Sequence, residues 1–389
     1  MTMVVGVPKD NIVGERRVAL TPTVIPSLKQ AGLTVLVESG CGQSAGFPDS
    51  AYQDKGAQVV SSKAELFATT DVIVQVRALG ANPAYREADL PYLRANQVLI
   101  GMMNPLAEAK AIQEVSGKGV TAFALELTPR IGRAQQMDVL SSMATVAGYK
   151  AVLLAAERLP KMFPLMMTAA GTVSPAHVFV LGAGVAGLQA VATARRLGAV
   201  VEAYDVRPTV STQVESLGAK FVHLPLDTEA AEDKYGYAQA VTEDFQRRQQ
   251  ELLSRHVAGS DVVIAAAVVP GQKAPTLITE EMVAKMPPGS VIVDLAAEQG
   301  GNCPLTRANE VVVQHGVTIL GPMNLAASVP YHASQMYAKN ITAFVRHLVK
   351  SGQLQIDRKD EIVQETLVAH GGSVVHPRIR EKLELAPLQ

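Results

Sequence analysis

Short apolar runs alternate with helical patterns through the first third of the chain. Five apolar runs are predicted to be strands: residues 4–7, 34–38, 71–77, 97–103 and 121–127. Helical patterns are expected between them, over residues 22–31, 50–55 and 105–115. Buried strands that alternate with helices form parallel sheets covered on both faces, so this part is expected to be an α/β domain.

A second series of the same kind follows residues 141–159, whose nearly unbroken helical pattern is expected to connect two domains. Its strands are expected at residues 177–181, 200–204, 262–266, 291–295 and 317–320. Residues 333–349 are helical again, and we interpret them as the chain crossing back to the first domain. The charged, glutamine-rich residues 227–255 are either a long surface helix or a loop followed by one.

These patterns predict an α/β fold of two Rossmann-like, doubly wound parallel-sheet domains joined by long helices. The first domain is expected to combine residues 1–140 with residues 322–389, and the second to consist of residues 141–321. A length of 389 residues, of which 48% are hydrophobic, is enough for two cores of ordinary size.

Composition and charge argue against several classes of protein. The net charge is −1 and the basic residues are scattered, whereas a nucleic-acid-binding surface needs a basic patch, so no nucleic acid is expected. Cys41 and Cys303 lie far apart and the eight histidines are dispersed, which predicts two reduced, buried thiols and no metal. The N-terminus lacks the pattern of a signal peptide, and no apolar run is long enough to predict a membrane span.

The strongest local motif follows the strand expected at residues 177–181. The sequence there is Gly182-Ala183-Gly184-Val185-Ala186-Gly187, and a helical pattern comes next. A strand, a GxGxxG turn and a helix are typical of dinucleotide-binding folds. The first glycine permits the tight turn, the second lets backbone N–H groups approach a pyrophosphate, and the third allows close packing of the helix. The alternative is a strand–turn–helix corner whose glycines are incidental.

The residue that follows the next strand favours NAD(H). Asp205 comes eighteen residues after Gly187, where a carboxylate can accept hydrogen bonds from both ribose hydroxyls and repels a 2′-phosphate. Val206 continues this candidate cofactor site. Arg207 either accommodates a 2′-phosphate or is a solvated surface charge, and we favour the surface charge.

A further strand end is a candidate part of the same site. Ala266, Ala267 and Val268 come at the end of a buried strand, and ligands of open α/β sheets bind outside the carboxyl ends of strands. Small side chains leave room for a cofactor, although alanines in a strand are equally typical of core packing. The same two interpretations apply to Asp294 and Glu298, beyond the next strand.

Three stretches together resemble one superfamily over nearly the whole chain. Residues 6–9 and 15–22, with the sequences GVPK and ERRVALTP, are similar to a start shared by two families. These are the alanine dehydrogenases and the NAD(H)-binding subunits of proton-translocating nicotinamide nucleotide transhydrogenases. The glycine fingerprint and residues 273–294 are also shared by both families.

The first domain distinguishes the two families. An alanine dehydrogenase needs a proton-transferring group near the nicotinamide, and its family uses a lysine at the end of the strand at residues 71–77 and a histidine after the next strand. This chain has Arg77 at the first position, which cannot act as an acid–base near neutral pH, and no histidine in residues 101–105. Arg17 resembles the arginine that binds substrate carboxylate in the dehydrogenases, and here we expect it to form a structural ion pair.

Residues 129–142 instead resemble the loop that transhydrogenases place beside the nicotinamide of NAD(H). The resemblance implies that Arg130, Asp138 and Ser141 orient the carboxamide and that Gln135 reaches toward the partner's nucleotide. Direct hydride transfer between two nicotinamides needs positioning and no general base, which suits these residue types. The alternative is a helix N-terminus with polar caps, for which Asp138 is a suitable residue.

A second family feature is a loop that folds over bound nucleotide through a Gly-Tyr-Ala sequence. Gly236, Tyr237 and Ala238 match this sequence inside the charged residues 227–255, so Tyr237 is a candidate cofactor-binding residue. The alternative is a tyrosine on a surface helix.

The resemblance implies a peripheral NAD(H)-binding subunit, a homodimer on the cytoplasmic, inner face of the plasma membrane. NADP(H) and the proton channel would belong to partner subunits, because the chain ends at Gln389 without fused membrane helices. Hydride would pass from NADH to NADP⁺ with Re/Si specificity, coupled to proton translocation, when the partners are present. Two rival functions remain: a self-contained NAD-dependent amino-acid dehydrogenase of the alanine type, and a non-catalytic NAD-binding protein.

Overall fold

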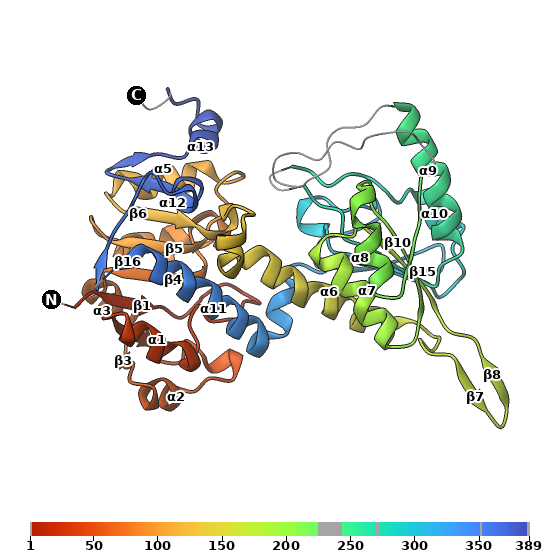
Figure 1. Cartoon of the computed structure of the whole chain (residues 1–389), viewed down its shortest axis with the longest axis horizontal. Helices are drawn as coiled ribbons and strands as arrows, with labels where there is room; N and C mark the ends of the chain where they lie inside the picture. Colours follow the sequence, from red (N-terminus) through yellow and green to blue (C-terminus); the bar gives the residue numbers. More distant parts are fainter. Residues whose placement is uncertain (1, 225–242, 270–271, 351, 387–389) are drawn as a thin grey trace. The chain divides into compact units, whose positions relative to one another are not determined.

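Figure 1 shows a computed structural model of the chain, which describes residues 2–224, 243–269, 272–350 and 352–386. The chain divides into two compact units. Unit 1 comprises Met1–Met143 and Ala327–Gln389, and unit 2 comprises Ala144–Ala326. The divisions expected from the sequence come after residues 140 and 321. Each unit is built around its own, mostly parallel sheet, so the predicted fold class is confirmed.

The sheet of unit 1 contains strands from both ends of the chain. They are β1 (Val4–Val7), β2 (Thr34–Glu38), β3 (Gln58–Val60), β4 (Val72–Arg77), β5 (Val98–Met102), β6 (Thr121–Ala124), β18 (Leu367–His370) and β19 (Ser373–Val374). Their order is β19-β18-β6-β5-β4-β1-β2-β3. The pairs from β6 to β3 are parallel, whereas β18 and β19 are antiparallel additions. The chain therefore completes this sheet only after it has passed through unit 2.

Helices and strands together bury the core of unit 1. The helices are α1 (Ile25–Gln30), α2 (Asp49–Asp54), α3 (Lys63–Thr69), α4 (Tyr85–Ala88), α5 (Ala109–Gly117), α11 (Pro330–Leu348), α12 (Glu361–Thr366) and α13 (Pro377–Lys382). A small hairpin, β16 (Val349–Lys350) and β17 (Gln353–Leu354), follows α11. α5 packs against β6, β18 and β19, and α3 packs against β1 and β2. Ile73, Leu99 and Ile112 belong to one buried cluster of this core.

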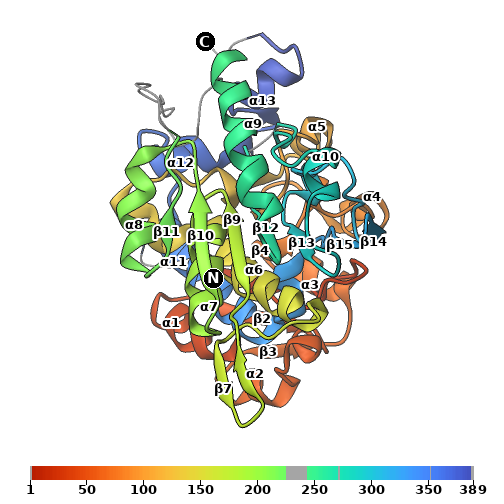
Figure 2. The same ribbon diagram turned by 90° about the vertical axis from the view of Figure 1, so that its right-hand side faces the viewer.

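The sheet of unit 2 has the strand order of a dinucleotide-binding fold. Its strands are β9 (His177–Leu181), β10 (Val200–Tyr204), β11 (Lys220–Phe221), β12 (Val262–Ala265), β13 (Val291–Asp294), β14 (Val311–Gln314) and β15 (Val317–Leu320). The order is β11-β10-β9-β12-β13-β15-β14, parallel except for β14, and Figure 2 shows β10, β9 and β12 side by side. Strand order reverses at β9, which is where ligands bind in open α/β sheets.

Both faces of the unit 2 sheet are covered. The helices of this unit are α7 (Val185–Arg196), α8 (Ser211–Ser216), α9 (Glu243–Ala258) and α10 (Glu280–Ala284). Along β9, Val178 and Val180 belong to one apolar cluster, and Phe179 and Leu181 belong to another. Successive side chains of a strand point to opposite faces, so the continuous apolar run reflects burial on both sides.

Helix α6 (Val139–Arg158) begins in unit 1 and ends in unit 2. Among the described residues it is the single helix that is long and apolar enough to cross a membrane by length and composition, so the expectation that no such segment exists is wrong. Its apolar composition has a structural cause, because Ala151, Val152 and Ala155 are fully buried in the core of unit 2. A helix that is apolar all round is typical of a buried core position.

A hairpin extends from unit 2 that the sequence does not predict. β7 (Met166–Thr168) and β8 (Gly171–Val173) form a two-stranded antiparallel sheet of their own, and all of their residues are exposed. Figures 1 and 2 show the hairpin extending away from the rest of its unit. Strands of three residues give too short a pattern for recognition in the sequence.

The strand predicted at residues 121–127 is shorter than expected. It ends at Ala124, and Leu125–Leu127 form a 3-10 turn, η5. The turn brings the carboxylate of Glu126 onto the loop after β5, where Oε1 accepts hydrogen bonds from the backbone N–H groups of Met103 at 2.6 Å and Asn104 at 2.5 Å. A polar side chain bound in this way cannot continue the buried strand.

Candidate functional site

The glycines of the fingerprint have the conformations that the motif requires. Gly182 has a φ of +90°, and a Cβ on it would lie 2.9 Å from backbone atoms of Ala266 and Ala267, so a larger residue would be strained and would clash. A Cβ on Gly187 would collide with the carbonyl oxygen of Gly182. The tight turn and the first turn of α7 are therefore packed backbone against backbone.

Gly184 leaves open space in front of α7. It is the N-cap of this helix and makes no side-chain hydrogen bond, and no atom lies within 4 Å of where its Cβ would be. Val185 and Ala186 are the first helical residues, so their N–H groups lie at the positive end of the helix dipole. Open space beside these N–H groups fits a pyrophosphate.

Asp205 lies beside the fingerprint turn. Its Oδ2 accepts a hydrogen bond from the backbone N–H of Ala183 at 2.8 Å, which ties the end of β10 to the turn. Arg207 binds the same carboxylate through Nε at 2.9 Å and Nη2 at 3.0 Å. The interpretation of Arg207 as a solvated surface charge is therefore wrong, because the charge is paired and its side chain is 17% exposed. Val206 packs against an apolar cluster of unit 2.

The loop after β12 borders the same turn. Ala266 donates its N–H to the carbonyl oxygen of Leu181 at 2.7 Å, and the peptide between Ala266 and Ala267 lies against Gly182. The side chain of Val268 is partly exposed. These small residues therefore lie at the carboxyl edge of the sheet, next to the candidate pyrophosphate position.

Asn302, which belongs to no motif recognised in the sequence, holds this loop. Its Nδ2 donates to the carbonyl oxygens of Ala267 and Pro275, each at 2.8 Å. Its Oδ1 accepts a hydrogen bond from the N–H of Ala267 at 3.1 Å. The available signal in the sequence is the pair Gly300 and Gly301 directly before it, which indicates a tight turn.

Asp294 and Glu298 have structural partners. Asp294 is fully buried at the end of β13. Its hydrogen-bond donors are the backbone N–H groups of Ala296, Asn302 and Cys303 and the hydroxyl of Thr306. Burial raises the pKa of Asp294, although these donors act to lower it. Glu298 accepts from the backbone N–H of Asn324 at 2.5 Å. Of the two interpretations, the geometry favours the structural one for both carboxylates.

The 130–141 loop lies in unit 1. Its 3-10 turn, η6 (Gly132–Met137), buries the side chains of Ala134 and Met137. Arg130 and Gln135 are exposed. Apolar residues thus anchor the turn, and polar residues of the loop are accessible to a ligand.

Asp138 and Ser141 form the cap of α6. The carboxylate of Asp138 accepts hydrogen bonds from the backbone N–H of Ser141 at 2.9 Å and from its hydroxyl at 2.6 Å. This geometry is that of a helix N-cap, which is the alternative interpretation of Asp138. The same two side chains are those that the resemblance assigns to the nicotinamide carboxamide, and they lie together.

Two residues near the end of the chain hold the 130–141 loop. Asn340, on α11, donates from Nδ2 to the carbonyl oxygen of Gln136 at 2.7 Å. Asp360 accepts from Nη1 of Arg133 at 2.6 Å and caps α12 at the backbone N–H of Ile362. Burial raises the pKa of Asp360, but these hydrogen bonds outweigh it and bring the pKa down to about 2. The carboxylate is therefore ionised at any ordinary pH.

The features that would mark an amino-acid dehydrogenase are changed in this chain. The structural ion pair predicted for Arg17 is confirmed, because Nη2 lies 2.6 Å from Oε2 of Glu15 and both side chains are buried. Arg77 ends β4. The loop at residues 103–104 is bound by Glu126, whose pKa is raised to about 7 by burial.

The remaining predictions concern the lid, the thiols and a metal. Gly236, Tyr237 and Ala238 lie outside the described residues, so the lid stays a prediction. Cys41 and Cys303 are free, buried thiols, as predicted, and burial raises the pKa of Cys41 to about 12. Within the described ranges, no group of histidine, cysteine, aspartate and glutamate residues is arranged to hold a metal ion.

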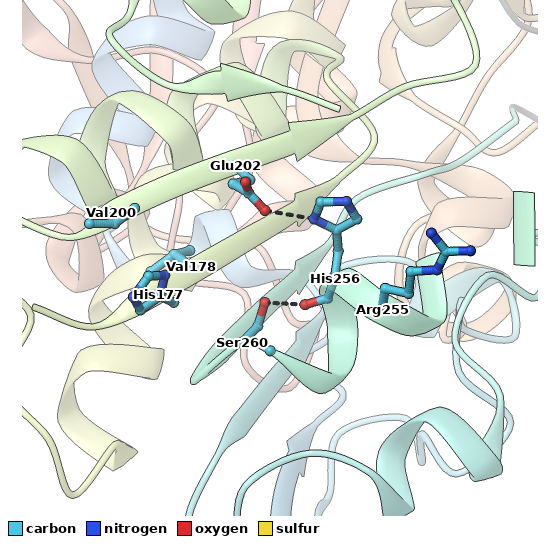
Figure 3. A pocket seen from close by; sticks show the side chains of 8 residues that line it. His177, Val178, Val200, Glu202, Arg255, His256 and Ser260 are labelled. Atoms are coloured by element: carbon cyan, nitrogen blue, oxygen red, sulfur yellow. Dashed lines mark hydrogen bonds and ion pairs between the residues drawn. The ribbon is translucent and has the colours of Figure 1, made fainter. Parts of the chain in front are cut away.

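A small cavity of about 100 Å³ lies at the other end of β9 (Figure 3). It is lined in part by His177, Glu202, Arg255 and His256, and Nδ1 of His256 lies 2.6 Å from Oε2 of Glu202. His177 is the first residue of β9, whereas the fingerprint follows its last. The cavity is therefore separate from the candidate dinucleotide site, and it is too small for a dinucleotide.

Comparison with known families covers most of the chain. Residues 6–147 match the family described as "Alanine dehydrogenase/PNT, N-terminal domain". Residues 151–377 match "Alanine dehydrogenase/PNT, C-terminal domain".

Two groups of curated proteins are similar to this chain. An NAD(P) transhydrogenase subunit alpha protein of Rhodospirillum rubrum is 44% identical over 97% of this chain and 99% of its own length. Its counterpart from Rickettsia prowazekii, which has the same name, is 40% identical over 97% of both chains. Alanine dehydrogenase 2 of Staphylococcus aureus is 28% identical over 98% of this chain and 97% of its own length.

Solved structures show the same two likenesses. A transhydrogenase from Sinorhizobium meliloti superposes with a TM-score of 0.83 at 43% identity, covering 96% of this chain and 99% of that one. An L-alanine dehydrogenase superposes with a TM-score of 0.80 at 27% identity, covering 98% and 99%. The two folds are almost equally similar, and the transhydrogenase sequence is much closer.

Proposed function

This chain belongs to the alanine dehydrogenase/PNT family, and from that premise we propose that it is the NAD(H)-binding subunit of a proton-translocating NAD(P) transhydrogenase. The observation that carries the choice between the two branches is Arg77 at the end of β4, together with the absence of histidine from residues 101–105. A guanidinium cannot exchange a proton near neutral pH, so imine reduction has no acid–base group at these positions.

Unit 2 binds NAD(H) in this proposal. The first N–H groups of α7 bind the pyrophosphate across Gly184, and Asp205 accepts hydrogen bonds from the adenosine ribose. Ala266, Ala267 and Val268 border the same position. The closeness of Asp205 to Ala183 supports this assignment, because it puts the carboxylate next to the phosphate turn. Tyr237 would close over the nucleotide.

The 130–141 loop of unit 1 orients the nicotinamide. NAD(H), when bound, supplies the hydride, so the protein has to hold and orient it and to exclude water. Arg130, Asp138 and Ser141 position the carboxamide, and Gln135 faces the nucleotide on the partner. None of these side chains has to move a proton at neutral pH, which agrees with a transfer that needs no general base.

The acceptor and the proton channel belong to partner subunits. NADP(H) is bound by one of them, hydride passes directly and with Re/Si specificity, and proton translocation through the membrane-spanning partner is coupled to the transfer. The chain therefore works as a peripheral subunit on the cytoplasmic, inner face of the plasma membrane. Relatives named as the alpha subunit of an NAD(P) transhydrogenase support a multi-subunit complex.

We further propose a homodimer that is formed in part by the β7–β8 hairpin. Residues 162–176 carry no charged side chain, and Met167 at the hairpin is 77% exposed. A projecting ribbon with open edges and no charges invites pairing with another chain. A second copy is the natural partner, because one edge can pair antiparallel with itself across a two-fold axis.

One assay separates the three candidate functions. NADH oxidation by the purified chain is measured first with pyruvate and ammonia, and then with an NADP⁺ analogue and the partner's NADP-binding domain. The proposal requires no oxidation in the first mixture and rapid transfer in the second. Oxidation with pyruvate and ammonia would identify an amino-acid dehydrogenase, and NADH binding without either reaction would identify a non-catalytic protein.

A further inference from the structure

We propose that Asn302 is a positioning residue for the dinucleotide, because its side chain sets the place of the Ala266–Ala267 peptide beside the phosphate turn. This inference rests on the proposed binding of NAD(H) by unit 2. It assigns to a buried amide the task of keeping one wall of that site at a fixed distance from Gly182.

The amide of Asn302 binds both polar groups of one residue. Its Oδ1 accepts from the N–H of Ala267 at 3.1 Å, and its Nδ2 donates to the carbonyl oxygen of Ala267 at 2.8 Å. A donor and an acceptor held in one plane fix Ala267 in position and in orientation. Nδ2 also donates to the carbonyl oxygen of Pro275 at 2.8 Å, which joins the two ends of the loop that leaves β12.

Only an amide of this length meets these demands. A carboxylate of the same shape lacks the two N–H groups and would place its charge against two carbonyl oxygens. A serine hydroxyl is too short to span from Ala267 to Pro275. Leaving the carbonyl oxygens without their donor would carry the cost of a buried, unsatisfied polar group.

Asn302 is itself held from behind. Its backbone N–H donates to Oδ2 of Asp294 at 2.8 Å, and its carbonyl oxygen accepts from the N–H groups of Leu277 and Ile278, each at 3.0 Å. Asn302 is fully buried, as is Asp294. A side chain anchored at its backbone in this way transmits the position of the sheet end at β13 to the loop after β12.

The opposite side of the peptide leaves no slack. A Cβ on Gly182 would lie 2.9 Å from the carbonyl carbon of Ala266 and from the nitrogen of Ala267. The peptide therefore touches the fingerprint turn on one face and is bound by Asn302 at its polar groups. A shift of Ala267 toward the turn would press on Gly182, and a shift away would open the wall of the site.

Regular structure does not supply this support. β12 ends at Ala265, and α10 begins at Glu280. Between them the described residues form no strand or helix, so the position of Ala267 depends on side-chain hydrogen bonds. This dependence makes Asn302 a determinant of the site as well as of the fold.

The test compares NADH-induced thermal stabilisation of the full chain in three variants. Asn302→Asp removes the donors while keeping the shape, and Asn302→Ser removes the amide without adding a charge. The matched control is Asp261→Asn, which changes one buried polar group at the other end of β12. Asp261 accepts from Lys161 at 2.5 Å and from the backbone N–H of His177 at 2.9 Å.

NADH is added at about 100 times the wild-type dissociation constant. We expect both Asn302 variants to bind NADH about tenfold more weakly, which reduces the ligand-induced stabilisation to about half of the wild-type value. Asp261→Asn should lower the thermal midpoint of the free protein and keep the full ligand-induced rise. A purely structural role of Asn302 would lower the midpoint alone.

The outcomes are distinguishable. If wild type shows no rise with NADH, the proposed function fails before Asn302 is tested. If wild type responds and Asn302→Ser shows the same rise as Asp261→Asn, the positioning role is overturned. If Asn302→Asp does not fold, the serine variant decides.

Discussion

The guanidinium of Arg207 and the carboxylate of Asp205 are joined by two hydrogen bonds, of 2.9 and 3.0 Å, on the residue proposed to bind the adenosine ribose. The pair neutralises the charge that would repel a 2′-phosphate, and it occupies both carboxylate oxygens. Ribose hydroxyls must therefore displace or share these bonds when NAD(H) binds.

Removing Arg207 should sharpen the choice of cofactor. In Arg207→Ala the carboxylate of Asp205 keeps its full charge and has free oxygens, so NADH should bind more tightly and NADPH more weakly. A change of about 1 kcal/mol in this difference is roughly fivefold in the ratio of dissociation constants. Calorimetric titration with both nucleotides measures the ratio.

The control for charge removal is Lys220→Ala. Lys220 is an exposed cation on the neighbouring strand β11 and pairs with Glu202. This variant should leave the ratio unchanged, whereas Asp205→Ala should weaken NADH and narrow the gap between the nucleotides. A ratio that falls in Arg207→Ala would show that the arginine attracts the ribose end of NADH instead of competing with it.

The second prediction separates orientation from affinity in the 130–141 loop. Gln135→Asn and Asp138→Asn should slow hydride transfer about tenfold, a loss of about 1.4 kcal/mol in transition-state stabilisation. Their NADH dissociation constants should change far less, because adenosine and pyrophosphate supply most of the affinity. The measurement is single-turnover transfer to an NADP⁺ analogue on the partner domain, beside NADH titration.

The cap geometry of Asp138 makes this test clean. Asparagine is as good an N-cap as aspartate, so Asp138→Asn should keep the start of α6 and move the unfolding free energy by less than about 0.5 kcal/mol. Normal transfer rates in both variants would leave Asp138 as a helix cap and place the active site elsewhere.

The third prediction concerns the hairpin. Met167→Asp places a charge on the exposed β7 ribbon, where pairing with a second copy would bury it. The mass in solution, measured by light scattering, should fall from twice 41.2 kDa to 41.2 kDa at micromolar concentration. Val313→Asp, on an exposed valine of the edge strand β14, is the matched control and should leave the mass unchanged. A wild-type mass of 41.2 kDa would end the dimer proposal.

The fourth prediction is a pH dependence of stability caused by Glu126. Burial raises its pKa in the folded state from 4.5 to about 7. A carboxyl group with a raised folded pKa binds more protons when folded, so its contribution is complete below pH 4.5 and is lost as the pH rises through 7. The difference corresponds to about 3 kcal/mol.

Glu126→Gln removes this titration while keeping an acceptor for Met103 and Asn104. Denaturant unfolding at about pH 5 and about pH 8 should therefore show a smaller loss of stability in the variant than in wild type. Equal losses in the two proteins would mean that Glu126 titrates in the folded state as it does in the unfolded chain.

Much of the fold was within reach of the sequence because the buried strands are continuous apolar runs between turn residues. β1, β2, β9, β10 and β15 have the predicted bounds. β18 is different, because it adds to the sheet beside β6 and its place depends on pairing with residues more than two hundred positions away. No local pattern carries that information.

The candidate site divides in the same way. The glycine turn and Asp205 form a local motif, so both could be located from spacing alone. The pairing of Arg207 depends on a side-chain conformation, and Asn302 reaches Ala267 across 35 positions. The ion pair between Arg133 and Asp360 spans 227 positions. Such contacts become visible when the chain is folded.

Unit 2 is a single uninterrupted segment, whereas unit 1 needs both ends of the chain. During synthesis, unit 2 can therefore fold as soon as it emerges, while the first six strands of unit 1 wait for β18, β19 and α11. Asn340 and Asp360, which hold the 130–141 loop, are among the last residues to be made. A nascent or C-terminally truncated chain would carry a finished nucleotide-binding unit beside an unanchored loop. Hydride transfer competence would thus be acquired last, only after translation reaches the end of the chain.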